Sequence, residues 1–86
     1  MQKKNNPSMN TDKNLDAPGH ACISLTPRIK QAISSLQGLQ ILKVFNDDPS
    51  SRIGVPAWCR LTGHKLIEVV ELDESQTLFY IQKKIL

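Results

Sequence analysis

The chain has 86 residues, 40% of them apolar and 22% charged, which is the composition of one soluble globular domain and too little length for two. Its longest uninterrupted apolar run, at residues 78–81, is far shorter than the roughly 20 residues of a membrane-spanning helix, and the polar start lacks the apolar core of an export signal. These features exclude membrane insertion and predict a cytoplasmic protein. We expect its two cysteines to be reduced thiols, although the sequence does not exclude a bridge between Cys22 and Cys59.

The formal net charge is +3, and its distribution along the chain is uneven. No Asp or Glu occurs in residues 17–46 or in residues 49–67, and each of these segments contains a predicted helix. The helices carry basic residues without a compensating carboxylate, namely Arg28, Lys30, Arg52 and Arg60. We expect an electropositive helical side that binds an acidic protein or an RNA; a solvated basic face without a partner is the alternative.

Residues 1–12 are polar and have no apolar periodicity, so we expect a disordered N-terminal tail and a folded domain over residues 13–86. Residues 15–17 form a short candidate strand that ends at Pro18 and Gly19. A first helix follows, because apolar residues recur at Leu25, Ile29, Ala32, Ile33 and Leu36. Ser24 or Thr26 is its expected N-cap, Pro27 fits its first turn, and Gly38 is its expected stop.

The apolar residues 39–45 predict a buried strand. Asp48 is then expected to cap a second helix with Pro49 at its first position, Pro56 to kink or divide that helix, and Gly63 to end it. Residues 64–72 and 77–83 predict two strands joined by a polar turn.

The predicted order is strand, helix, strand, helix, strand, strand. Two amphipathic helices need a sheet to cover, which gives an α+β fold: a two-layer sandwich with both helices on one face of a four-stranded sheet. A right-handed crossover makes the first two strands parallel and the final hairpin is antiparallel, so the sheet is mixed.

Cys22 lies between a predicted strand end and a helix start, where free amides and the helix dipole favour a thiolate. A small buried side chain is the alternative reading of this residue. Cys59 falls in the middle of a helix, beside Trp58, and is expected in the core. His20 either tunes Cys22 or is a solvated loop residue. The His and Cys spacings do not match paired zinc ligands, so we expect no metal.

Three stretches resemble the TusA (SirA-like) family of sulfur carriers. Residues 15–22 read LDAPGHAC and are similar to the family's LDxxGxxC opening; residues 46–49 (NDDP) and 55–64 (VPAWCRLTGH) resemble its DDP turn and its IPxFC and GH elements. The resemblance covers residues 15–84 and implies the same two-layer sandwich. Residues 22–25 read CISL where the family signature is CPxP, so both signature prolines are absent.

The resemblance implies that Cys22 carries a persulfide. It would accept sulfur from a cysteine desulfurase or a rhodanese-like donor and pass it to an acceptor protein in tRNA thiolation, cofactor synthesis or sulfur oxidation, as a carrier without a cofactor rather than a multiple-turnover enzyme. The alternative is a regulatory or binding module of the same fold that has lost sulfur transfer and binds a protein or RNA through its basic helical face. Under either reading the expected docking residues are Arg28, Lys30, Arg52 and Arg60.

Overall fold

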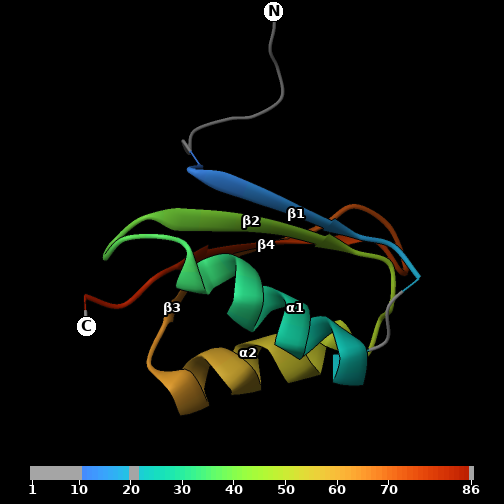
Figure 1. Cartoon of the computed structure of the whole chain (residues 1–86). Helices are drawn as coiled ribbons and strands as arrows, with labels where there is room; N and C mark the ends of the chain where they lie inside the picture. The colour runs from blue at the N-terminus through green and yellow to red at the C-terminus, as the bar shows by residue number, and fades with distance from the viewer. Residues whose placement is uncertain (1–10, 20–21, 86) are drawn as a thin grey trace, which may run out of the picture.

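The computed structural model describes residues 11–19 and 22–85, with the backbone alone at residues 22 and 23. Its elements follow the predicted order (Figure 1) and are β1 (Lys13–Ala17), α1 (Cys22–Ser34), β2 (Ile41–Asn46), α2 (Ser51–Thr62), β3 (Lys65–Glu71) and β4 (Thr77–Gln82).

The four strands form one sheet in the order β1-β2-β4-β3. β1 pairs with β2 in parallel, with Leu15 opposite Val44, and the other two pairings are antiparallel. The mixed sheet and the terminal hairpin are therefore confirmed. The last strand lies inside the sheet, between β2 and β3, so β1 and β3 form the two edges.

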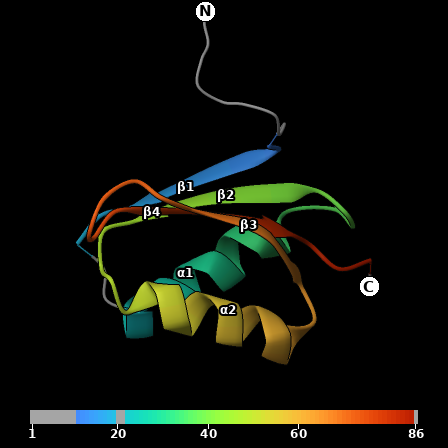
Figure 2. The same cartoon turned by 180° about the vertical axis from the view of Figure 1, so that it is seen from behind.

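Both helices cover the same face of the sheet, and both begin at the end of the sandwich where β1 and β2 finish (Figures 1 and 2). Alternate residues of β2 are buried toward the helices, as a sheet with one covered face requires. The core between the layers includes Leu25, Ile29, Leu42, Val44, Val55, Phe79 and Ile81, all with no exposed surface. Each such side chain contributes roughly 1.5–3 kcal/mol when it leaves water.

The predicted limits of α1 are wrong at both ends. α1 begins at Cys22, so Ser24 and Thr26 lie within it and Pro27 is inside the helix instead of in its first turn. Burial explains the earlier start, because Leu25 is fully buried on the same helical stripe as Ile29. α1 ends at Ser34, well before Gly38.

α2 begins at Ser51, two residues after Pro49, and Ser50 is its N-cap without a side-chain capping bond. The Asp48 carboxylate instead accepts hydrogen bonds from the backbone and hydroxyl of Ser50, at 3.0 and 2.9 Å. The helix is continuous through Pro56, so the predicted division into two pieces is wrong. Gly63 ends it as predicted, because its φ of 88° is readily adopted only by glycine and its N–H bonds to the Cys59 carbonyl.

The folded part includes Asp12, which the sequence assigned to the tail. The Asp12 N–H donates to the Ile41 carbonyl at 2.8 Å, and the Ile41 N–H donates to the Asp12 carboxylate at 2.8 Å. These bonds, one to the backbone and one to the side chain, fix Asp12 beside the start of β2. The first ten residues of the tail predicted over residues 1–12 lie outside the described residues.

Candidate functional site

Cys22 is the first residue of α1, on the chain segment that follows the end of β1 at Ala17. The first backbone N–H groups of a helix have no partner within it, and together with the helix dipole they stabilise an anion beside them. A cysteine at this position is consequently placed for thiolate chemistry. His20, the residue expected to tune Cys22, lies outside the described residues.

The segment that leads to Cys22 is bonded to the loop that follows β2. The side-chain amide of Asn46, which is fully buried, donates to the Ala17 carbonyl at 2.8 Å. The Gly19 N–H donates to the Asp47 carboxylate at 2.8 Å. These two bonds fix the end of β1 and the turn after it, three residues before the cysteine.

Gly19 has a φ of +78°, a conformation that costs a residue with a Cβ atom roughly 1–2 kcal/mol. Glycine is therefore favoured at the turn after β1, although a Cβ atom there would meet no other atom within 4 Å. The sequence marked Gly19 as a breaker and placed Asn46 and Asp47 in the NDDP stretch that resembles the family's turn, but it predicted no contact between these two residues and the segment before Cys22. Their position was available from the parallel pairing of β1 with β2, which brings the ends of both strands to the same place.

The four predicted docking residues do not share one environment. Arg28 and Lys30 are exposed on α1, and Arg60 is exposed on α2. Within residues 11–19 and 22–85, none of these three side chains has a hydrogen bond or ion pair. Arg28 borders a shallow groove of about 250 Å³ between β1 and α1, together with Lys13, Leu15, Gln31 and Ala32.

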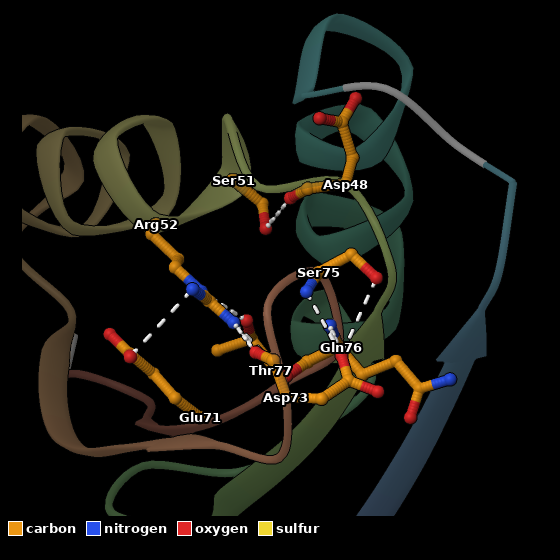
Figure 3. Close-up of polar contacts among 8 residues, drawn as sticks. All are labelled: Asp48, Ser51, Arg52, Glu71, Asp73, Ser75, Gln76 and Thr77. Carbon is orange, nitrogen blue, oxygen red and sulfur yellow. Dashed lines mark hydrogen bonds and ion pairs between the residues drawn. The ribbon is translucent and has the colours of Figure 1, made fainter.

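Arg52 is bonded to the β3–β4 hairpin instead of facing solvent freely (Figure 3). Its Nε donates to the Thr77 hydroxyl at 2.7 Å, and its Nη2 donates to the carbonyls of Asp73 and Gln76. Its Nη1 lies 3.7 Å from the Glu71 carboxylate. The described contacts thus give Arg52 a role in joining α2 to the hairpin.

Asp73 organises the turn that Arg52 contacts. Its carboxylate accepts the backbone N–H groups of Ser75 and Gln76 at 2.9 and 2.7 Å (Figure 3). Both bonds lower the pKa of Asp73, and the bond from Gln76 has the larger effect. The turn therefore has a defined shape that holds its carbonyls toward α2.

Cys59 has the environment expected of a core residue. It is a free thiol with 3% of its surface exposed, and burial raises its pKa to about 11. A thiolate is disfavoured there, so this residue is unsuited to nucleophilic chemistry at neutral pH. Of the two cysteines, only Cys22 occupies a helix start.

His64 lies two residues after the C-terminal end of α2, and its ring contacts both the C-terminal segment and α2. Its Nδ1 accepts the Lys84 N–H at 3.1 Å, and its ring stacks on Trp58 with centroids 5.4 Å apart. Among the residues that the structure describes, no three His, Cys, Asp or Glu side chains gather as metal ligands. No helix in the described part of the chain has the length and apolar character needed to span a bilayer.

The chain is a small two-layer α+β domain that presents a cysteine at the start of its first helix. The segment before this cysteine is bonded to the residue that follows the neighbouring strand. Comparison with known proteins gives the family: residues 13–83 match the family described as "Sulfurtransferase TusA". The chain belongs to the TusA sulfurtransferase family.

Individual relatives agree with this assignment. The chain is 41% identical to the protein YrkI of Bacillus subtilis (strain 168), over 87% of this chain and 99% of that one. It is 36% identical to the sulfur carrier protein TusA of Pseudomonas putida (strain F1), over 85% and 90% of the two chains. A SirA-like protein from Desulfitobacterium hafniense has the same fold, with a TM-score of 0.71, 23% identity, and coverage of 84% of this chain and 97% of that one.

Proposed function

We propose that this protein is a sulfur carrier that holds transferable sulfur as a persulfide on Cys22. The observation that carries the proposal is the position of Cys22 as the first residue of α1. The Pseudomonas putida relative is named a sulfur carrier, which supports the same activity here. Helix amides at this position favour the thiolate that sulfur transfer requires.

The proposed transfer is a thiolate exchange that needs no external oxidant or reductant. The Cys22 thiolate attacks the outer sulfur of a persulfide on the donor protein, and the donor cysteine leaves as a thiolate. Cys22 then carries the persulfide, and the thiolate of an acceptor protein removes its outer sulfur in the same way. A cysteine desulfurase is the donor we propose, and both partners act in the cytoplasm.

The helical layer is the surface we propose for these partners, because it combines exposed cations with an absence of carboxylates. Neither α1 nor α2 contains an Asp or a Glu. An acidic partner can reach three exposed cations, Arg28, Lys30 and Arg60. Arg52 adds positive charge to the same layer, although its side chain is bonded to the hairpin.

Sulfur loading tests the proposal. The chain is incubated with a recombinant cysteine desulfurase and L-cysteine, and each cysteine is then examined by mass spectrometry without reductant. We expect one added sulfur atom on Cys22, its loss in Cys22→Ser, and normal loading in Cys59→Ser. If loading survives in Cys22→Ser and is lost in Cys59→Ser, the assignment to Cys22 is wrong and Cys59 carries the sulfur. A wild-type chain that takes no sulfur would favour the binding module without sulfur transfer.

A further inference from the structure

Helix α2 has two apolar stripes, of which the sheet covers only one. Val55 and Cys59 form the buried apolar stripe and pack in the core, one and two turns after the buried polar residue Ser51. On the outer side, Ile53 and Leu61 have 79% and 87% of their surface exposed. Among the residues whose side chains are described, 11–19 and 24–85, these are the two most exposed large apolar side chains, and both belong to the same helix.

These residues form a continuous strip along the helix. Ile53, Ala57 and Leu61 follow one another at intervals of four residues, and Arg60 lies one heptad after Ile53. We call these four residues the α2 outer face. At 1.5 Å per residue the strip is about 12 Å long. A single exposed aliphatic residue is ordinary, but two on one helical strip indicate a surface that a partner covers.

Local structure does not account for Ile53. Isoleucine is a poorer helix former than the long polar residues usual on a solvent face, because its branched Cβ loses rotamer freedom in a helix. Its side chain gains little burial in the fold in return, since 79% of its surface stays exposed.

Charge decides among the occupants of this face. A second copy of the chain would bring Arg60 against the same acid-free helical layer, where Arg28 and Lys30 have no described counter-ion. RNA favours aromatic platforms for its bases, and Trp58, the aromatic residue of α2, already packs on the core and stacks on His64. An acidic protein surface with an apolar depression complements both the aliphatic side chains and the cation.

We propose that the α2 outer face is the docking surface for the protein that donates sulfur to Cys22, and that this donor presents an apolar pocket bordered by carboxylates. The proposal rests on the proposed function. Both helices begin at the same end of the sandwich, so a protein seated along α2 extends to the start of α1 (Figures 1 and 2). A protein donor needs such a surface to hold its persulfide at Cys22, whereas a small polysulfide needs none.

The test compares two sulfur sources on the same variants. Initial rates of sulfur loading on Cys22 are measured with a recombinant cysteine desulfurase plus L-cysteine, and separately with inorganic polysulfide. The double variant Ile53→Gln/Leu61→Gln removes the apolar strip. The matched control is Ile85→Gln, which changes a side chain that is 74% exposed and lies outside the helices.

We expect the double variant to lose at least tenfold in desulfurase-dependent loading, through a higher KM for the carrier, and to keep its polysulfide-dependent rate. Arg60→Gln should reduce desulfurase-dependent loading severalfold and weaken its dependence on salt. Ile85→Gln should match the wild type in both assays. Circular dichroism and thermal unfolding verify that every variant is folded.

Each failure has a distinct signature. Equal desulfurase-dependent rates in the wild type and the double variant would overturn the docking surface while leaving the carrier function intact. An equal loss with both sulfur sources would also overturn it, because the substitutions would then act on Cys22 itself. A wild-type chain that neither source loads would overturn the proposed function.

Discussion

The two cysteines of this chain occupy backbone positions with opposite effects on a thiol. Cys22 begins a helix, while Cys59 lies in the middle of one and is 3% exposed. The helix start at Cys22 and the burial of Cys59 are therefore expected to make the two thiols differ in reactivity, although they have the same chemistry in isolation.

Alkylation against pH will measure that separation. We predict that iodoacetamide modifies native Cys22 at a lower pH than a free cysteine, whose pKa is roughly 8.5, because helix amides and nearby cations favour the thiolate. Cys59 should react only after unfolding, because burial raises its pKa to about 11. Mass spectrometry of each peptide gives the two profiles. A native Cys22 that is unreactive at every pH would contradict the prediction.

The double variant Arg28→Gln/Lys30→Gln examines the cationic contribution to this profile. We expect the alkylation curve of Cys22 to move to slightly higher pH. The change should be modest and should decrease with salt, because both side chains are exposed and water screens their charge. A curve that does not move at low ionic strength would leave the helix amides as the cause of reactivity.

Asp47 is predicted to stabilise the segment before Cys22 through the hydrogen bond that its carboxylate accepts from Gly19. Asp47→Ala should lower the free energy of unfolding by about 1 kcal/mol, the usual contribution of such a bond. Asp47→Asn keeps an oxygen in the same place and should restore most of the loss. Urea unfolding measures both variants. Equal destabilisation by Ala and Asn would mean that the charge matters and the bond does not.

At the scale of elements, Arg52 joins α2 to the β3–β4 hairpin through one side chain. We predict that Arg52→Gln lowers the free energy of unfolding by about 1.5–3 kcal/mol, because the hydroxyl of Thr77 and the carbonyl of Asp73 lose a charged donor. Arg60→Gln is the matched control, since Arg60 is exposed on the same helix and should change stability little. If denaturant unfolding gives the same loss of stability for Arg52→Gln and Arg60→Gln, the contacts of Arg52 with the hairpin do not stabilise the fold.

The sequence predicted the elements well because each has a local signal. Helical spacing identified α1, and a run of branched apolar residues identified β2. The start of α1 and the division of α2 were predicted wrongly because proline signals compete with burial: Pro27 and Pro56 are both accommodated inside helices whose apolar stripes are packed.

The functional site was only partly predictable. Cys22, the residue proposed to carry sulfur, could be selected because its position between a strand and a helix is visible in the sequence. The predicted parallel pairing of β1 with β2 places Asn46 and Asp47 near the segment before Cys22, but the individual hydrogen bonds depend on the strand register, which no local pattern contains. Arg52 was grouped with the other helical cations for the same reason, since its partners come from the hairpin.

In the whole molecule, the segment after β4 contacts the C-terminal ends of both helices. The Lys83 ammonium donates to the Leu36 carbonyl, just beyond α1, at 2.7 Å, and the Lys84 ammonium donates to the Thr62 carbonyl of α2 at 2.8 Å. Cations at these ends satisfy free carbonyls and oppose the negative pole of each helix dipole. Lys83 and Lys84, which directly follow β4, thereby connect the helical layer with this inner strand of the sheet.

The Lys84 N–H also donates to Nδ1 of His64, which makes this connection sensitive to pH. Protonation of Nδ1 would remove the acceptor. Burial, followed by the charges of Lys84 and Lys83, lowers the pKa of His64 below its ordinary 6.5. The unfolded chain consequently binds this proton more readily than the folded one. The stabilisation is complete above pH 6.5 and is lost as the pH falls from 6.5 through the lower pKa of the folded state.

We predict that the melting temperature falls between pH 7 and pH 5 in the wild type and falls less in His64→Asn, whose side-chain oxygen takes the position of Nδ1 and can accept the Lys84 N–H without titrating. The difference between the two proteins isolates His64, since all other groups titrate in both. Asp73 does not interfere, because its lowered pKa means that its stabilising contribution is present above pH 3.8 and is lost only as the pH falls below that value. Thermal unfolding followed by circular dichroism at half-unit pH steps measures the two slopes. Identical slopes would show that His64 is protonated equally easily in both states, and that its bond to the C-terminal segment does not stabilise the fold.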